Sequence, residues 1–310
     1  MTSASQQHSV TSANAGRSRA KKQDGKLKQG KLKGAAKPLK SGKKPKQAKP
    51  LSAKTADVHQ LYELSVQDPP TEVAILDRVF KKLSGRRAIS LREDFCGTAY
   101  LCASWVASRA DRTATGVDLD ASVLASGRAR HVEPLGEAAQ RVTLLQDDVR
   151  ALRAERFDIV CGYNFSYWIF TTRDALRAYF VAAREALVAD GIFTLDAYGG
   201  TEAMEVREES RKIAGGFTYV WDQAEFNPID HSVVNHIHFR FKDGTKLNRA
   251  FTYAWRFWTL PEIQELLLEA GFTEVSVYWD IADDDDDADY RPRKVVENQL
   301  SWVCYLVARR

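Results

Sequence analysis

Residues 89–99 read Ile89-Ser90-Leu91-Arg92-Glu93-Asp94-Phe95-Cys96-Gly97-Thr98-Ala99, and this stretch decides the fold. It begins as a short apolar strand, turns at Cys96-Gly97 and leads into an amphipathic helix over about 99–109. A strand that turns through glycine into a helix N-terminus gathers free backbone N–H groups, which suits a hydrogen-bonding ligand. The acids Glu93 and Asp94 at the end of the strand favour a ligand with a cationic group over a pyrophosphate.

The single glycine of this turn disfavours a nicotinamide or flavin dinucleotide, whose fingerprint is G-x-G-x-x-G. The stretch instead resembles the glycine-rich motif of class I S-adenosylmethionine-dependent methyltransferases, often written D-x-G-C-G-T-G. Glu93 stands at the acidic position and Cys96-Gly97-Thr98 match, whereas Phe95 and Ala99 replace the first and third glycines. For the stretch alone, the alternative interpretation is an ordinary strand–helix turn of an α/β protein.

The next strand, Ala114 to Asp120, also ends in acids. A carboxylate roughly twenty residues past a glycine turn can accept hydrogen bonds from both ribose hydroxyls, as in nucleotide-binding βαβ units. The resemblance gives this role to Asp118, with Leu119 beside it. We prefer Asp118 over Asp120 because Asp118 falls at the strand's end, whereas Asp120 is better placed to cap the following helix.

A third strand runs through residues 142–146 and is followed by Asp147, Asp148 and Val149. In the resembled family an acid at this point accepts from the adenine amino group, and the next residue packs on the ring. Asp148 and Val149 match those two places. Taken singly, Asp147 and Asp148 would also suit a solvated turn, but they form the third acidic strand end in order.

The fourth strand, residues 157–162, resembles the family's F-D-x-V strand, whose carboxyl end faces the transferred methyl group. Aromatic and polar residues follow it, and aromatic faces attract a sulfonium or ammonium by cation–π interaction. A helix over about 172–188 and a fifth strand ending in Asp196 come next. The catalytic candidates are Asn164, Tyr163 and Asp196. The alternative for the aromatics, Trp168 above all, is core packing.

Five strands alternating with helices, each followed by polar residues, predict a doubly wound α/β sheet with its ligand at the strands' carboxyl ends. The resemblance refines this to a Rossmann-like methyltransferase sheet, mostly parallel with an antiparallel last strand, and with helices on both faces. Helices are expected over 57–66, ending at Pro69-Pro70, and from Thr71 onward. The cofactor-binding residues that the resemblance implies are Arg92, Glu93, Phe95, Gly97, Thr98, Asp118, Leu119, Asp148, Val149 and Asn164. Among them, Arg92 would hold the methionyl carboxylate and Glu93 would lie near the amino end.

From residue 201 the alternation stops, and three antiparallel strands are predicted over 217–221, 233–241 and 246–258, with a turn at Lys242-Asp243-Gly244. Such an inserted β lid holds substrate specificity in the resembled family. His236 and His238 share one strand face, but no third ligand stands at useful spacing, so substrate contact or packing is preferred to a metal. The substrate-pocket candidates are Tyr62, Tyr167, Tyr198, His236, His238 and Trp255.

The predicted domains are therefore a disordered basic tail (1–54), a cofactor-binding core (55–200), the lid (201–258) and a C-terminal helix with closing strands (259–310). The tail holds fifteen of the 45 Lys and Arg residues but one of the 41 acids, and it has no aromatic residue. Residues 17–54 could bind nucleic acid or another polyanion, or they could simply aid solubility; an organellar transit peptide is a further alternative. The acidic run Asp283–Asp287 is interpreted as a solvated loop.

The four cysteines lie far apart without C-x-x-C, which fits reduced thiols and a cytoplasmic protein. No apolar run approaches ~20 residues, so no membrane span is expected. The leading hypothesis is a methyltransferase that uses S-adenosyl-L-methionine and releases S-adenosyl-L-homocysteine, with a small-molecule acceptor. The alternatives are an RNA or protein methyltransferase that uses the basic arm, and a non-catalytic cofactor-binding module.

Overall fold

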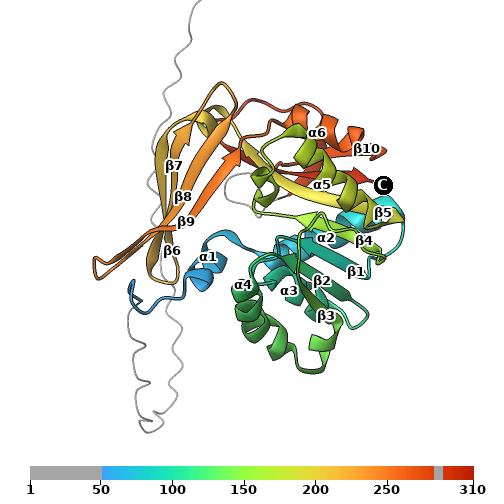
Figure 1. The fold of residues 1–310 in the computed structure, drawn as a ribbon, viewed down its shortest axis with the longest axis horizontal. Helices are drawn as coiled ribbons and strands as arrows, with labels where there is room; N and C mark the ends of the chain where they lie inside the picture. The colour runs from blue at the N-terminus through green and yellow to red at the C-terminus, as the bar shows by residue number, and fades with distance from the viewer. Residues whose placement is uncertain (1–50, 283–288) are drawn as a thin grey trace, which may run out of the picture. The chain divides into compact units, whose positions relative to one another are not determined.

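The computed structural model describes residues 51–282 and 289–310. Residues 1–50, which hold most of the predicted basic arm, and the predicted acidic loop at 283–287 lie outside this part. The described chain forms an eight-stranded sheet and a separate four-stranded sheet (Figure 1). The strands of the first sheet are β1 (Ser90–Asp94), β2 (Thr113–Asp118), β3 (Val142–Gln146), β4 (Phe157–Gly162), β5 (Leu187–Gly199), β10 (Glu274–Asp280), β11 (Tyr290–Arg293) and β12 (Trp302–Arg309).

The first sheet has the order β11-β10-β12-β5-β4-β1-β2-β3. Its five strands from β1 to β5 pair in parallel, whereas β12 runs antiparallel to both β5 and β10. The chain leaves β3 and returns on the far side of β1 to form β4, so the strand order reverses between β1 and β4. The carboxyl ends of these strands flank the crevice where open α/β sheets bind ligands. The predicted fold class is confirmed, and β11 is a strand that was not predicted.

Helices cover both faces of this sheet, and its central strands are therefore buried on both sides. Ile159 and Cys161 of β4 pack towards α2 and α3, whereas Val160 packs towards α5 and α6. The helical segments are α1 (Val58–Val66), α2 (Pro69–Ser84), α3 (Tyr100–Ser108), α4 (Ala121–Gly127), η1 (Arg128–Val132), η2 (Glu133–Arg141), η3 (Ser166–Ile169), α5 (Arg173–Glu185), η4 (Thr201–Met204) and α6 (Leu260–Glu269). No described helix has the length and apolar character needed to cross a membrane.

Helix α2 begins two residues earlier than the prolines suggested. Pro69 and Pro70 were expected to end the preceding helix, but they occupy the first two positions of α2 itself. Proline is tolerated there because its missing N–H would have no partner within the helix. Gly85, with φ of +72°, then ends the helix in a left-handed cap.

The second sheet is antiparallel, with the order β6-β7-β8-β9. Its strands are β6 (Arg207–Ile213), β7 (Phe217–Phe226), β8 (Ser232–Phe241) and β9 (Lys246–Arg256). The hairpin turn at Lys242-Asp243-Gly244 lies between β8 and β9, with φ of +83° at Gly244. The edge strand β6 was not predicted. Helix α1 lies beside this sheet (Figure 1). Its Leu61 packs with Phe217 and Phe239 in a small core.

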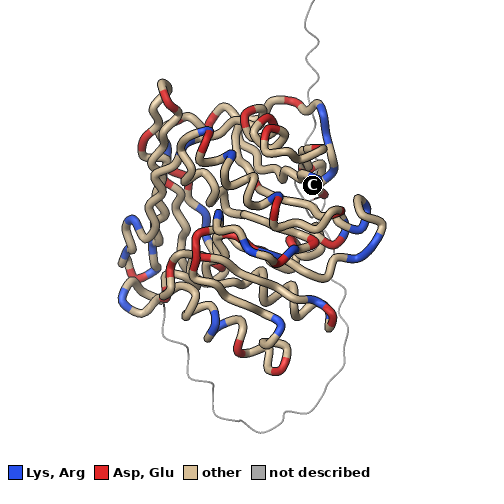
Figure 2. The backbone as a smooth tube through the Cα atoms, turned by 45° about the vertical axis from the view of Figure 1, so that its right-hand side comes forward, with Lys and Arg blue, Asp and Glu red and all other residues tan. Residues whose placement is uncertain are grey.

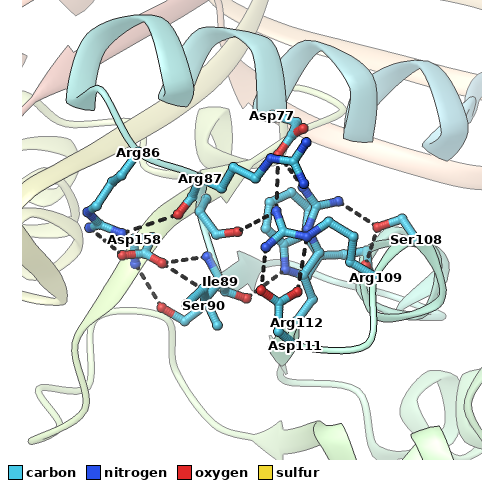
Figure 3. Close-up of polar contacts among 12 residues, drawn as sticks. Asp77, Arg86, Arg87, Ile89, Ser90, Ser108, Arg109, Asp111, Arg112 and Asp158 are labelled. Atoms are coloured by element: carbon cyan, nitrogen blue, oxygen red, sulfur yellow. Dashed lines mark hydrogen bonds and ion pairs between the residues drawn. The ribbon is translucent and has the colours of Figure 1, made fainter.

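A polar network fixes the amino end of β1, opposite the crevice (Figure 3). Asp158 at the start of β4 is buried, and its Oδ2 accepts hydrogen bonds from the N–H groups of Ile89 (2.6 Å) and Ser90 (3.0 Å). Its Oδ1 accepts from Arg86 Nη2 at 2.6 Å. This carboxylate thus aligns β1 with β4 at the amino ends of the two strands.

Asp158→Ala should lower the free energy of unfolding by about 3 kcal/mol, because two backbone N–H groups and Arg86 lose a buried acceptor. Urea denaturation measures the change. The matched control is Glu265→Ala on the exposed side of α6, which should shift stability by less than about 0.5 kcal/mol. Equal effects of the two substitutions would contradict the role given to Asp158.

Candidate functional site

The loop between β1 and α3 keeps a glycine-like backbone at every second residue. Phe95, Gly97 and Ala99 have φ of +57°, +53° and +55°. Phe95 and Ala99 are the positions at which the resembled motif has its first and third glycines. A left-handed conformation costs an L-residue roughly 1–2 kcal/mol. The loop geometry is therefore retained although two of the three glycines are not.

Contacts to the neighbouring strand and helix hold the loop in this conformation. Gly97 N–H donates to Asp118 Oδ2 (2.8 Å), and Cys96 N–H donates to the Val117 carbonyl (3.0 Å). Helix α4 packs so closely that a Cβ on Gly127 would lie 2.2 Å from the Thr98 carbonyl oxygen. By contrast, a Cβ on Gly97 would have no heavy atom within 4 Å. The loop is supported from below and open on the side of Gly97.

Phe95 does not close the open side of the loop. Its ring packs edge-on against Tyr179, with 5.5 Å between ring centroids, and against Phe170 at 6.1 Å. Both partners belong to the core on the α5 face of the sheet. Where the resembled motif has a glycine, the Phe95 side chain therefore packs into the core and stays out of the open side of the loop.

Glu93 and Asp118 meet at the carboxyl ends of β1 and β2. The Glu93 Oε2 accepts from the Cys102 N–H at 3.1 Å, so the strand supplies the capping group that Ala99 cannot offer to α3. Burial raises the pKa of Glu93 to about 7, and the charges of Asp118 and Asp94 add to this. The Glu93 carboxyl is thus a partly protonated acid at neutral pH.

Asp120 takes the capping role that its place in the sequence predicted. Asp120 caps α4 by accepting from the N–H groups of Ser122 (2.8 Å) and Val123 (3.2 Å). Asp118 Oδ1 accepts from the Asp120 N–H at 2.9 Å. Each oxygen of Asp118 thus holds one backbone donor and keeps a lone pair for another. Leu119 follows with 64% of its surface exposed, an apolar side chain with an uncovered face.

The loop after β3 places Asp148 and Val149 beside this edge. Asp148 forms a two-point contact with Arg150, at 2.6 and 3.0 Å, and this pairing lowers the pKa of the carboxyl. Val149 is buried, and its carbonyl accepts from Arg92 Nη2 at 2.6 Å. An adenine amino group would therefore have to share Asp148 with Arg150.

The hydrogen bond to the Val149 carbonyl corrects the prediction made for Arg92. It was expected to hold a cofactor carboxylate, but strand alternation turns it to the opposite face of β1 from Glu93. There it pairs with Asp94 at 2.7 Å, and Tyr179 donates its hydroxyl to the same carboxylate at 3.1 Å. The Arg92 side chain is 4% exposed. Arg92 ties β1 to the β3–β4 loop and helix α5.

A second polar centre lies at the carboxyl ends of β4 and β5. Asp196 accepts from the N–H groups of Asn164 (2.7 Å) and Phe165 (2.9 Å), both of which have φ of +57°. This carboxylate fixes a strained turn next to the crevice. Burial raises the pKa of Asp196 to about 7 despite these two donors.

Two of the predicted residues here are part of the core. The Tyr163 hydroxyl is within 3.0 Å of Thr194 Oγ1, and the Tyr167 hydroxyl donates to the Asp196 carbonyl at 2.9 Å. Both side chains are buried and neither lines the cavity described below. The expectations that Tyr163 acts in catalysis and that Tyr167 lines the pocket are therefore corrected: the two residues support the turn from beneath.

A cavity of about 620 Å³ opens between this edge and the second sheet. Helices α1 and α2 close it with Tyr62, Gln67 and Glu72. Asn164, Asp196, Tyr198 and Trp255 line it as well, as the sequence predicted for the pocket and reacting groups. The aromatic residues that line it are Tyr62, Phe165, Tyr198, Tyr219, Trp221, Tyr253, Trp255 and Tyr305.

His236 and His238 point away from this cavity, which corrects their place in the pocket. Residues of β8 alternate between its faces, and Ile237 is the one that reaches the cavity. His236 Nδ1 lies 2.9 Å from Thr252 Oγ1, and His238 Nε2 lies 3.1 Å from Asp222. No group of three or more His, Cys, Asp or Glu side chains suited to a metal occurs in residues 51–282 and 289–310.

The sequence analysis did not predict four residues that line the cavity, namely Glu72, Tyr219, Trp221 and Tyr305. The alternation of β7 carried a signal, since Tyr219 and Trp221 stand two residues apart on one face. The sequence carried no such signal for Glu72, because acidic residues are common in the first turn of a helix. Burial, with the charges of Glu93 and Asp196, raises the pKa of Glu72 to about 8.

Acids with raised pKa make the folded protein less stable as pH increases. Glu72 in the folded state holds its proton up to pH about 8, whereas the unfolded chain releases it near pH 4.5. Folded protein therefore binds more protons across this window, and stability contributed by the neutral acid is lost as the pH rises through it. Glu93 and Asp196 act in the same direction up to pH about 7.

Glu72→Gln should therefore gain stability relative to wild type as the pH rises from 5 to 8, because the amide cannot ionise. Urea midpoints at both pH values measure the difference. Glu137→Gln, at an exposed position of η2, is the control and should leave the wild-type pH dependence unchanged. An unchanged pH dependence in Glu72→Gln would show that Glu72 ionises normally.

Comparisons with known proteins assign this fold. A methyltransferase dependent on S-adenosylmethionine from Clostridium acetobutylicum ATCC 824 aligns at a TM-score of 0.58 and 17% identity, covering 81% of this chain and 96% of its own. CalS10, an amino pentose methyltransferase from Micromonospora echinaspora, aligns at 0.61 and 15%, covering 82% and 97%. KedS8, a sugar N-methyltransferase from Streptoalloteichus sp. ATCC 53650, aligns at 0.57 and 16%, covering 88% and 98%.

No protein-family model and no curated protein matches the sequence. The structural likeness nevertheless extends over most of the chain, and the strand order and antiparallel β12 agree with it. The chain has the Rossmann-like fold of class I S-adenosylmethionine-dependent methyltransferases.

Proposed function

We propose that this protein is a methyltransferase that transfers a methyl group from S-adenosylmethionine to a small molecule. The observation that supports it most is the position of the cavity. It begins at Asn164 and Asp196, at the carboxyl ends of β4 and β5. Strand β4 pairs with β1, whose following loop at 95–99 is hydrogen-bonded to Asp118. A cofactor along the crevice at these strand ends would direct its methyl group to the cavity mouth.

The residues at the crevice fit S-adenosylmethionine. The open side of Gly97 leaves room for close approach of a ligand to the backbone. The free lone pairs of Asp118 suit the two ribose hydroxyls, and the uncovered side chain of Leu119 suits an adenine face. Asp148 would lie on the adenine side and Glu93 beneath the methionyl end. The expectation that Val149 packs on the ring is corrected, because its side chain is buried in the core.

S-adenosylmethionine, when bound, supplies a methyl group already activated on a sulfonium. The protein then has to align acceptor and methyl carbon and exclude water. The strained turn at Asn164 and Phe165, fixed by Asp196, offers a rigid wall for that alignment. Helix α1 and the second sheet supply further residues to the lining of the cavity.

A small acceptor fits the shape of the cavity, since small-molecule sites are typically ~300–1,000 Å³, concave and largely aromatic. Two of the structural neighbours, CalS10 and KedS8, are described as sugar methyltransferases, which agrees with an acceptor of that size. In the described part of the chain, acidic and basic positions are interspersed along the backbone (Figure 2).

Asp118→Ala should weaken binding of S-adenosylhomocysteine at least about tenfold, because two hydroxyl hydrogen bonds to a carboxylate are lost. Isothermal titration calorimetry measures the affinity. Asp120→Ala is the matched control: it removes the helix cap, costs about 1 kcal/mol of stability, and leaves the affinity unchanged. Equal losses of affinity in both variants would refute the ribose role of Asp118.

Transfer itself is tested with methyl-labelled S-adenosylmethionine and a panel of amines, thiols and hydroxylated metabolites, read by mass spectrometry. Label in a small product supports the proposal. Tight cofactor binding without any transfer would instead indicate a non-catalytic cofactor-binding module.

Gly97→Ala and Gly85→Ala form a second matched pair. Both glycines have positive φ and open space around a new Cβ, so each variant should lose about 1 kcal/mol of stability. Only Gly97→Ala should also weaken the binding of S-adenosylhomocysteine, since the methyl group of the new alanine would enter the crevice. Denaturation and calorimetry on the same samples separate the two effects. Full affinity in Gly97→Ala would place the cofactor elsewhere.

A further inference from the structure

We infer that the methyl acceptor is an aliphatic amine, bound in the cavity as its ammonium form. This inference rests on the proposed function and identifies the acceptor class of that same cavity. Three independent features of the lining support it: aromatic faces, an excess of carboxylates and a buried acceptor without a donor.

The aromatic wall crosses from one sheet to the other. Tyr253 and Trp255 of β9 stack with 4.3 Å between ring centroids. Trp221 of β7 lies 6.2 Å from Tyr253 and 6.3 Å from Tyr198 of β5. Tyrosine and tryptophan faces attract an ammonium group by cation–π interaction, most strongly when water is excluded.

The charged side chains of the lining are mainly acidic. Asp68, Glu72, Asp196 and Glu209 face a single cation, Arg211. Arg211 is engaged elsewhere, because its Nη2 donates to the Ser65 carbonyl and its guanidinium lies over the Tyr219 ring. An anionic acceptor would therefore meet repulsion in this cavity, and a cationic one attraction.

Glu72 and Gln67 are acceptors in the lining with unused capacity. No N–H or O–H of the described residues donates to the Glu72 carboxyl, in contrast to the two donors on Asp196. Gln67 Oε1 is buried and likewise has no donor in residues 51–282 and 289–310. A buried acceptor without a partner costs about 1–3 kcal/mol. An ammonium group has only donors to offer and so matches acceptors of this kind.

Methyl transfer to the amine involves the Glu72 carboxyl as the acceptor of one proton. The positive charge of the bound ammonium favours the ionised form of Glu72, so the carboxyl first releases its own proton to solvent. The resulting carboxylate then takes one proton from the ammonium, which leaves a neutral amine with a free lone pair. That lone pair forms the new N–C bond while the C–S bond breaks and its electron pair stays on sulfur. The product is an N-methylammonium, and the proton on Glu72 later passes to solvent.

The experiment uses the full chain saturated with S-adenosylhomocysteine and three probes of one shape: cyclohexylamine, cyclohexanol and cyclohexanecarboxylate. Calorimetry at pH 7.5 and low salt should show cyclohexylamine binding about tenfold or more tightly than cyclohexanol, with the carboxylate weakest. Glu72→Gln should remove most of the preference for the amine and leave cyclohexanol unchanged. Glu137→Gln should behave as wild type.

The outcomes separate this inference from the proposed function. Binding of cyclohexanol or the carboxylate as tight as that of the amine overturns the amine assignment, even if S-adenosylhomocysteine binds normally. Failure of S-adenosylhomocysteine to bind overturns the proposed function, whatever the probes do. The wild-type comparison of the three probes needs no variant, so the inference stays testable if Glu72→Gln does not fold.

Discussion

The hydrogen bond between Gly97 and Asp118 is the interaction on which the rest of the structure depends. It links the loop after β1 to the end of β2 and so holds three left-handed residues in place. With that loop fixed, α3 starts above Glu93, which caps it from the strand. Asp118 is also the group proposed to bind ribose, so one carboxylate would both fix the loop and bind the ligand.

Buried carboxyls follow from this arrangement, because parallel strands bring their carboxyl ends to one edge. Asp94 has its own cation in Arg92 and a donor in Tyr179. Among the described residues, Glu72, Glu93 and Asp196 have no cationic partner, and burial raises the pKa of each. An edge rich in acids without a cation favours ligands that bring positive charge. A sulfonium donor and an ammonium acceptor both do so, which makes the crevice and the cavity chemically consistent.

The fold could be predicted from the sequence because strand ends, turns and helix caps are local features. The order of acids after β1, β2 and β3 placed Glu93, Asp118 and Asp148 correctly at neighbouring strand ends. Side-chain direction was harder. Arg92 was assigned to the ligand although it alternates with Glu93, and only the register of β1 decides which face each takes.

The lid was the least predictable part. Strand β6 is a mostly exposed edge whose charged residues carry no apolar alternation, so nothing in its composition signals a strand. His236 and His238 were read as pocket residues because they share a face, but the sequence does not say which face meets the cavity. Tyr163 and Tyr167 resembled site residues because they follow β4, where core packing and ligand contact use the same aromatic side chains.

The most direct test of the account is a crystal structure with S-adenosylhomocysteine bound. The account predicts both ribose hydroxyls within hydrogen-bonding distance of the Asp118 carboxylate, and the sulfur directed to the turn at Asn164 and Phe165. A nucleoside bound away from Asp118, or a crevice that stays empty at saturating ligand, would contradict it.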